Sequence, residues 1–215
     1  MVNPGKRPYQ SDSRSDAALR TRRRVLDAGR FLFTRKGIDP TTIAQIAERA
    51  GVSEATVYAT VKSKSGLLHA LLEEAMFGPR FKDAQKKLEG VSDPVERIAL
   101  TAQVARAIYE GESTELGVLV KSSAFSPELR KVQQAFESLR REMQQERIQA
   151  LFKAGRARRG LTRELAATLL WLYTAREIYH KLVLESGWTP ERYQAWLEKT
   201  LLEALTDGAR GAAVC

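Results

Sequence analysis

The chain has 215 residues, enough for one large domain or two small ones with a buried core. Its 35 Lys and Arg residues outnumber the 26 Asp and Glu residues. The resulting net charge of +9 suits acidic ligands, membrane surfaces or nucleic acid. The single cysteine, Cys215, excludes an intrachain disulfide and a cysteine-based metal cluster, and it fits a reducing compartment.

Positive charge gathers at the amino-terminal end of the chain. Residues 1–64 carry 13 basic and 6 acidic side chains, so seven of the nine surplus charges lie in this segment. The first residues are polar and lack the apolar core of a signal peptide, and no run approaches the ~18 apolar residues that a membrane-spanning helix needs. We therefore expect a soluble, cytoplasmic protein without a membrane partner.

Helical periodicity begins after a polar start. Residues 1–19 are rich in Pro, Gly and Ser, a composition that predicts a disordered basic arm. From Thr21 onward apolar residues recur at helical spacing, Val25 and Leu32 among them, until Gly37 closes the run. A first helix with one buried face is therefore predicted between Thr21 and Gly37.

Two short helices joined by a tight turn follow. Thr42 can cap the first of them, and Gln45 can reach back to it as a capping box. Gly51 ends that helix, and Ser53 caps a second one that runs to about Val61. Short helices joined through a glycine turn are typical of a helix-turn-helix, although an ordinary helical hairpin within a core has the same pattern.

The rest of the chain keeps a helical period, without convincing alternation of the strand type. Helix starts are indicated where a capping side chain precedes a proline, at Asp93-Pro94, Ser126-Pro127 and Thr189-Pro190. A long apolar helix is predicted from about Thr162 to Ser186. The fold class is therefore predicted to be all-α, with about nine helices.

The predicted third helix exposes side chains that suit nucleic acid. They are short or bear hydroxyl groups, so they can approach phosphates and base edges at little entropic cost. These residues are Ser53, Glu54, Ala55, Thr56, Tyr58 and Thr60. Lys62 and Lys64 add positive charge where the helix would leave the groove.

Residues 22–75 closely resemble the DNA-binding domain of the TetR family of bacterial transcriptional regulators, and they read RRRVLDAGRFLFTRKGIDPTTIAQIAERAGVSEATVYATVKSKSGLLHALLEEA. The resemblance implies a positioning helix at residues 43–50 and a recognition helix at residues 53–61. It places Thr42, Tyr58 and Lys64 where members usually touch phosphates. The positions nearest base edges are then Ser53, Glu54, Ala55, Thr56 and Thr60.

One pair of residues departs from the family's pattern. Members often carry His or Tyr followed by Phe where this chain has Thr60-Val61. Thr60 can reach a thymine methyl group or a phosphate. The resemblance therefore leaves the base preference open.

The resemblance also divides the chain into domains. A disordered basic arm is expected at residues 1–19, a helix-turn-helix DNA-binding domain at 20–66, and an effector-binding and dimerisation domain at 67–210. Whether the arm itself contacts DNA stays open, since basic arms can enter a minor groove but more often remain solvated.

Aromatic and Met residues of the larger domain lie on helices that enclose the effector pocket in this family. The candidate pocket residues are Phe77, Tyr109, Phe125, Phe136, Met143, Trp171 and Tyr173. Packing in a core is the alternative role for each of them. As pocket residues, they would suit an apolar or aromatic small molecule.

The last two predicted helices carry more apolar surface than a small domain needs, and a helical homodimer interface would absorb it. The candidate interface residues are Tyr179, Leu182, Trp196, Leu197 and Leu201.

The leading hypothesis is a homodimeric transcriptional repressor that binds a near-palindromic operator and is released by a small-molecule effector. An enzyme fused to a DNA-binding end is the second hypothesis, but the sequence shows no Gly-rich phosphate loop and no paired histidines. A sequence-tolerant architectural DNA binder is the third. We expect no catalytic residues, no metal site and no cofactor.

Overall fold

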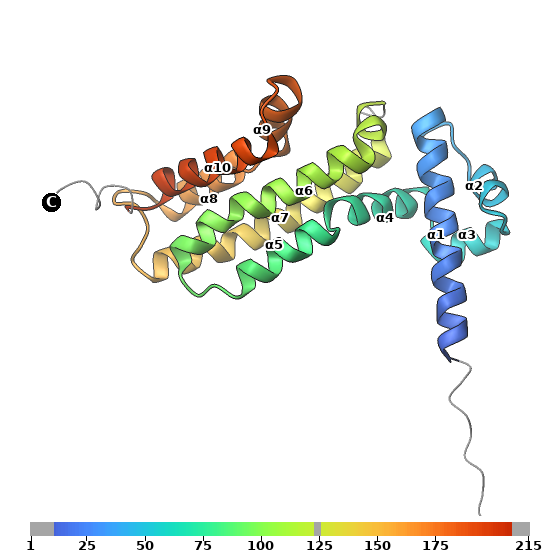
Figure 1. Cartoon of the computed structure of the whole chain (residues 1–215), viewed down its shortest axis with the longest axis horizontal. Helices are drawn as coiled ribbons and strands as arrows, with labels where there is room; N and C mark the ends of the chain where they lie inside the picture. Colours follow the sequence, from blue (N-terminus) through green and yellow to red (C-terminus); the bar gives the residue numbers. More distant parts are fainter. Residues whose placement is uncertain (1–10, 123–125, 208–215) are drawn as a thin grey trace, which may run out of the picture. The chain divides into compact units, whose positions relative to one another are not determined.

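The computed structural model describes residues 11–122 and 126–207, and this part of the chain is helical (Figure 1). It contains ten α-helices and one short π-helix, with an isolated antiparallel bridge between Ala157 and Thr206 in place of strands. The predicted all-α fold is therefore confirmed. None of the described helices is long and apolar enough to cross a membrane.

The chain forms two compact units. The N-terminal unit takes residues 1–71 and 118–132, and the C-terminal unit takes residues 72–117 and 133–215. The N-terminal unit holds α1 (Ser11–Lys36), α2 (Ile43–Ala50), α3 (Glu54–Val61) and the start of α4 (Lys64–Met76), together with the end of α6 (Pro94–Ser122) and the start of α7 (Pro127–Lys153). The expected domain border after residue 66 lies near the division after residue 71, and the expected domains place residues 118–132 in the effector-binding domain.

Helix α1 begins earlier than expected. It starts at Ser11, so the prediction of a disordered arm is wrong for residues 11–19, while residues 1–10 lie outside the described part of the chain. Residues 15–20 are exposed on this helix. Ala17, Ala18 and Leu19 favour a helix by propensity alone, and an exposed helix shows no apolar period that would reveal it.

Apolar side chains of α1 to α4 make the core of the N-terminal unit. Val25 and Phe33 of α1, Ile46 of α2, Val57 of α3 and Leu67 of α4 are fully buried. Complete burial of such a side chain stabilises the fold by roughly 1.5–3 kcal/mol. The two short helices are thus held by one face each, which leaves their other faces to solvent.

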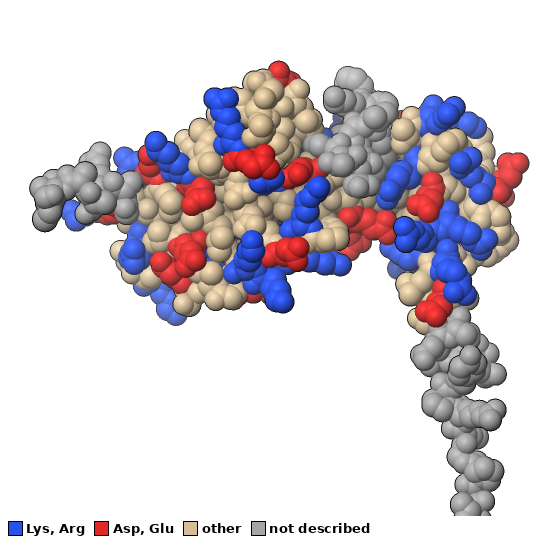
Figure 2. Space-filling view, viewed as in Figure 1, with Lys and Arg blue, Asp and Glu red and all other residues tan. Residues whose placement is uncertain are grey.

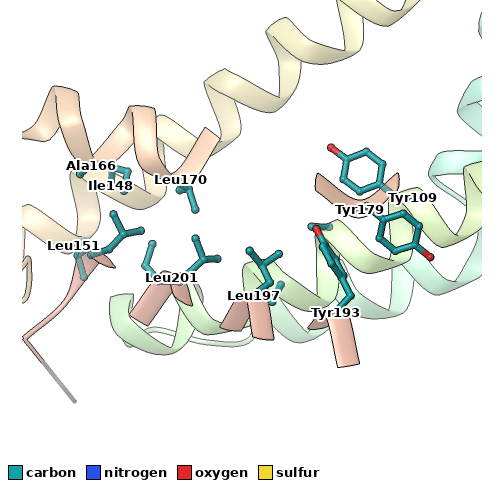
Figure 3. Close-up of a cluster of buried hydrophobic side chains, with 13 residues drawn as sticks. Tyr109, Ile148, Leu151, Ala166, Leu170, Tyr179, Tyr193, Leu197 and Leu201 are labelled. Carbon is teal, nitrogen blue, oxygen red and sulfur yellow. The ribbon is translucent and has the colours of Figure 1, made fainter. Parts of the chain in front are cut away.

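The C-terminal unit adds α5 (Pro79–Glu89), α8 (Arg163–Tyr173), α9 (Arg176–Tyr179), the π-helix (His180–Glu185) and α10 (Pro190–Leu205). Its core contains Ile148, Leu151, Ala166, Leu170, Leu197 and Leu201 at one end and Tyr109, Tyr179 and Tyr193 at the other (Figure 3). The rings of Tyr179 and Tyr193 meet edge to face, with their centroids 4.9 Å apart.

A break interrupts the helix predicted from Thr162 to Ser186. Helix α8 ends at Tyr173, and Ala175 is extended, with φ −68° and ψ 146°. The Thr174 carbonyl accepts hydrogen bonds from the Tyr109 hydroxyl (2.9 Å) and from Arg140 Nη1 (3.3 Å). Side chains from α6 and α7 therefore satisfy the carbonyl that the break removes from the helical ladder.

The helix starts predicted from X-Pro pairs are confirmed. Helices α6, α7 and α10 begin at Pro94, Pro127 and Pro190. Thr189 caps α10 by accepting a hydrogen bond from the backbone N–H of Arg192. These starts are set by side chains within three residues, so the sequence alone determines them.

Gly111 marks a close approach of α6 to α4. A Cβ atom at Gly111 would lie 2.2 Å from the Ala75 carbonyl oxygen. We expect Gly111→Ala to lower the free energy of unfolding by ~1–3 kcal/mol, because the overpacking outweighs the higher helix propensity of Ala. Gly90→Ala is the control, since its Cβ would make ordinary contacts of 3.6 Å and 3.7 Å. Urea unfolding of both variants measures the effect, and equal stabilities would contradict the packing at Gly111.

Candidate functional site

Helices α2 and α3 form the helix-turn-helix that the sequence predicts. Thr42 Oγ1 accepts from the Gln45 backbone N–H (3.3 Å), and Gln45 Oε1 accepts from the Thr42 backbone N–H (3.2 Å). The predicted capping box is therefore confirmed. Gly51 adopts the left-handed conformation, with φ 63° and ψ 43°, and makes the turn to Ser53. Ala47 is buried, as a contact residue between two steeply crossing helices must be.

The exposed face of α3 orders its own hydroxyl groups. Ser53 Oγ accepts from the Thr56 backbone N–H (3.1 Å) and lies 2.9 Å from Thr56 Oγ1. Thr60 Oγ1 donates to the Thr56 carbonyl (2.7 Å). The Thr60 hydroxyl therefore offers an outside partner its lone pairs and the neighbouring methyl group, while its proton is already donated.

The other predicted base-edge and phosphate residues of α3 are accessible. Glu54 and Ala55 are exposed, and half of the Tyr58 side chain is accessible to solvent. Lys62 is exposed at the end of the helix. These predicted contact residues are thus accessible along α3, but their contacts with DNA remain a prediction.

Lys62 occupies a strained turn between α3 and α4. Its φ is 65° and its ψ is −36°, and the Ser63 backbone N–H donates to the Val61 carbonyl across it (2.7 Å). This is the hydrogen bond of a γ-turn with positive φ, a rare conformation for a residue with a side chain. The sequence carries no glycine here that would reveal such a turn.

Lys64 and Ser126 converge on Asp39, in the loop before α2. Lys64 Nζ donates to the Asp39 carbonyl (2.9 Å), and Ser126 Oγ lies 3.1 Å from Asp39 Oδ1. Ser126 also caps α7 by accepting from the Leu129 backbone N–H (3.5 Å). Lys64, predicted to touch a phosphate, thus also ties the start of α4 to the loop that enters the helix-turn-helix.

Basic side chains dominate the N-terminal unit on the face shown in Figure 2, whereas acidic and basic side chains alternate over the C-terminal unit. Phe31 of α1 is partly exposed between two arginines, with Arg49 Cζ 3.3 Å and Arg35 Cζ 5.3 Å from its ring centroid. Such cation–π contacts hold charged groups at the surface in fixed positions. The unit thus presents an ordered positive surface.

The C-terminal unit contains two adjoining cavities. The first, of about 50 Å³, is lined by residues of α4 to α7, and the second, of about 470 Å³, extends to the break after α8. Both cavities are partly open to solvent. They share Met76, Tyr109, Phe136, Glu137 and Arg140, so they adjoin one another, and the two together are called the hollow.

Five of the seven predicted pocket residues line this hollow. Phe77, Tyr109, Phe136 and Met143 line the first cavity, and Trp171 lines the second. Tyr173 is instead packed against the core, and Phe125 lies outside the described residues. The structure therefore does not bring Tyr173 into this hollow.

Sequence reasoning missed the polar lining of the hollow. Glu137, Arg140, Gln144 and Arg147 follow one another at spacings of three and four along α7 and all line the first cavity. The signal was present in the sequence, because this stripe runs one residue behind the apolar stripe through Phe136 and Met143.

Most of these polar groups hold one another. Arg140 Nη2 pairs with Glu137 Oε2 (2.6 Å), and Trp171 Nε1 donates to the same oxygen (3.1 Å). Gln144 Nε2 donates to Thr174 Oγ1 (2.7 Å), beside the break in α8. Burial raises the pKa of the Tyr109 hydroxyl well above its usual value, so Tyr109 stays a neutral hydrogen-bond donor.

A buried ion pair lies at the far side of the second cavity. Glu112 is almost fully buried, and its two oxygens lie 2.9 Å and 2.8 Å from Arg176 Nε. Burial raises the pKa of the Glu112 carboxyl, and Arg176 opposes this rise. The pair fixes α9 against α6, next to the break.

The predicted dimer residues need correction. Tyr179, Leu197 and Leu201 are buried in the core of the single chain, so their assignment to an interface is wrong. Leu182 and Trp196 are partly buried. Exposed leucines that the prediction missed are Leu165 and Leu172 on α8 and Leu184 on the π-helix.

The helix-turn-helix matches a known protein family. Residues 25–71, which include the whole helix-turn-helix, match the family described as bacterial regulatory proteins, tetR family. The match covers the N-terminal part of the chain, including α2 and α3. The resemblance of residues 22–75 to this family is thereby confirmed.

The relatives of this chain bear the names of HTH-type transcriptional regulators. The uncharacterized HTH-type transcriptional regulator YvkB of Bacillus subtilis (strain 168) is 48% identical over 54 residues, which cover 25% of this chain and 29% of that protein. The HTH-type transcriptional regulator AcrR of Shigella flexneri is 28% identical over 130 residues, 57% and 58% of the two chains. The matches thus span less than two thirds of either relative.

Solved structures share the fold over most of this chain. NalD, the secondary repressor of the MexAB-OprM multidrug efflux pump in Pseudomonas aeruginosa, has a TM-score of 0.68 at 22% identity, covering 90% of this chain and 99% of NalD. SmeT, solved in complex with triclosan, has a TM-score of 0.63 at 21% identity, covering 88% and 93%. At these identities the likeness establishes the fold.

The turn at Lys62 predicts a difference between two substitutions. Lys62→Gly and Lys62→Ala both remove the charge, but only glycine adopts positive φ without steric cost. We expect Lys62→Gly to be more stable than Lys62→Ala by about 1 kcal/mol. Guanidinium unfolding monitored by circular dichroism measures the difference. Equal stabilities of the two variants would show that the γ-turn does not form.

Proposed function

We propose that this protein is a transcriptional regulator that binds operator DNA as a homodimer, acts as a repressor, and loses affinity for DNA when a small molecule occupies the C-terminal unit. The observation that carries the proposal is the exposed face of α3. Its hydroxyl groups and Tyr58 are accessible, while Val57 and Val61 anchor the opposite face. A helix that served packing alone would have no use for this ordered polar face.

The recognition mechanism follows from the helix-turn-helix. Helix α3 enters the major groove, Ser53, Thr56 and Thr60 approach base edges, and Thr42, Tyr58 and Lys64 hold phosphates. The basic surface of the N-terminal unit strengthens binding at low salt. In a twofold dimer, two copies of α3 read half-sites roughly 34 Å apart, which requires a near-palindromic operator.

The hollow in the C-terminal unit is the effector site of this proposal. Its aromatic lining suits a small molecule with an apolar or aromatic body. SmeT, which shares the fold, was solved with triclosan. We take the ligand to bind one dimer geometry better than the other, because only such a difference in affinity can shift the equilibrium.

Three helices carry the signal between the units. Helices α4, α6 and α7 all line the cavities, and all three continue into the N-terminal unit. Lys64 at the start of α4 and Ser126 before α7 both contact Asp39. A ligand that shifts these helices would therefore move the loop that enters α2.

Substitutions of Thr60 test the reading of bases. Thr60→Val keeps the shape and removes the hydroxyl group, while Thr60→Ser keeps the hydroxyl group and removes the methyl group. We expect each variant to change the preference among operator variants by ~1 kcal/mol. Fluorescence anisotropy should be measured with an operator selected from random duplexes, its single-base variants and random DNA.

Lys62→Gly is the matched control, because it removes an exposed charge without disturbing the turn. It should weaken binding to all duplexes alike and lower the salt slope by about one. Equal affinity of the wild-type protein for operator and random DNA would instead indicate an architectural DNA binder, and absence of DNA binding at low salt would refute the proposal.

Leu172→Glu tests the homodimer. Leu165 and Leu172 lie two turns apart on the exposed side of α8, and Leu172 also lines the rim of the second cavity. Helix α8 itself packs against α10 (Figure 1). Burying a carboxylate in a dimer interface should raise the dimer dissociation constant by at least ~30-fold. Sedimentation velocity measures it, with Leu19→Glu as an exposed control on α1. An unchanged dimer in the Leu172→Glu variant would place the interface elsewhere.

A further inference from the structure

Arg147 is a buried cation that faces the first cavity. It lies on α7, is 5% exposed, and lines the cavity together with residues of α4 to α6. Its Nη1 donates to Thr101 Oγ1 (3.2 Å), and that hydroxyl donates in turn to the Arg97 carbonyl (2.9 Å). This contact uses one of the five N–H donors of the guanidinium.

Arg147 makes no salt bridge among the described residues, although the charge of the adjacent Glu146 favours its charged form. Three other shielded arginines of this unit have a carboxylate partner: Arg140 pairs with Glu137, Arg176 with Glu112, and Arg106 with Glu110. Among the described residues, Arg97 resembles Arg147, because its Nε is buried without a hydrogen-bond partner. Glu137, the acidic residue that lines the first cavity, already pairs with Arg140. The cavity lining thus carries one uncompensated positive charge.

The environment of Arg147 disfavours that charge without removing it. Burial, followed by repulsion from Arg97, lowers the pKa of the Arg147 guanidinium to about 10, and the charge of Glu146 opposes this decrease. Arginine therefore stays charged at neutral pH. A buried charge without a carboxylate partner is costly, and groups perturbed in this way cluster at functional sites.

The rest of the cavity is apolar and rich in rings. Phe77 lies between Phe81 and Phe136, with ring centroids 4.8 Å and 5.5 Å apart, and Ile108 and Met143 add aliphatic surface. The lining therefore offers one anchoring point for an anion and a hydrophobic wall for the remainder of a ligand.

We propose that the effector is a small amphipathic carboxylate, whose carboxylate pairs with Arg147 and whose apolar chain or ring lies among Phe77, Phe81 and Phe136. This inference rests on the proposed function for the location of the effector site, and it adds the chemical class of the ligand. A neutral apolar molecule of the same shape would leave Arg147 without a partner.

Matched acids and alcohols test the charge. The probes are octanoate, decanoate and 4-phenylbutyrate, each paired with its primary alcohol, titrated into the full-length protein by calorimetry at pH 7. The wild-type protein should bind at least one acid about 10- to 100-fold more tightly than its alcohol, as expected for a hydrogen-bonded charge pair. Equal affinities within each pair, or no binding of any acid, overturn the proposal.

Arg147→Met tests the residue, because it replaces the guanidinium by an apolar chain of similar length. It should abolish the preference for the acid while the alcohol binds as before. Arg158→Met, an exposed arginine that does not line the cavity, should keep the preference. If Arg147→Met retains the preference for the acid, another group binds the carboxylate and the assignment to Arg147 is wrong.

Two further measurements separate the possible failures. The melting temperature of ligand-free Arg147→Met should equal or exceed that of the wild type, since a buried charge without a salt bridge is removed. A clear decrease would show that Arg147 stabilises the fold and is not held for a ligand. If Arg147→Met does not fold, the affinities of the wild-type protein for each acid and its alcohol decide alone whether the ligand is a carboxylate. Operator binding measured in parallel tests the proposed function. Acid binding that leaves the affinity for DNA unchanged would support the ligand class and refute the proposed regulation. Operator binding without acid binding would support DNA recognition and refute the ligand class.

Discussion

The position of the helix-turn-helix depends on the contacts of Asp39. This residue lies in the loop between α1 and α2, and its carbonyl accepts from Lys64 while its carboxylate contacts Ser126. The three segments that meet here are the entry to α2, the start of α4 and the start of α7. Because α4 and α7 also line the cavities, the loop before the positioning helix is tied to the helices that would respond to a ligand.

The recognition face is ordered before any partner binds. The Ser53 cap, its contact with Thr56 and the Thr60 bond to the helix backbone restrict three side chains, so less rotamer entropy is lost on binding. The γ-turn at Lys62 destabilises the end of this helix, since positive φ costs roughly 1–2 kcal/mol for a residue with a side chain. Burial of Val61 beside the turn offsets that cost.

Local features of this fold could be read from the sequence, and distant ones could not. The capping box of Thr42, the turn at Gly51 and the proline starts depend on residues within four positions of one another. The break at Thr174 depends on Tyr109, which is 65 residues away in the chain, and on Arg140. Helical periodicity continues across Thr174, because the side chains keep their apolar pattern even where the backbone ladder ends.

The same limit explains the errors at the candidate sites. Trp171 and Tyr173 are neighbouring aromatic residues on one helix, yet one lines a cavity and the other packs against the core. The difference lies in Arg141 and Glu137 of α7, which hold the Trp171 ring by a cation–π contact of 4.0 Å and a hydrogen bond. The network of α7 therefore sets both the shape of the hollow and the end of α8. Since α8 also carries the exposed Leu165 and Leu172, a ligand that displaces Arg140 or Gln144 would act on the helix proposed to hold the two protomers together.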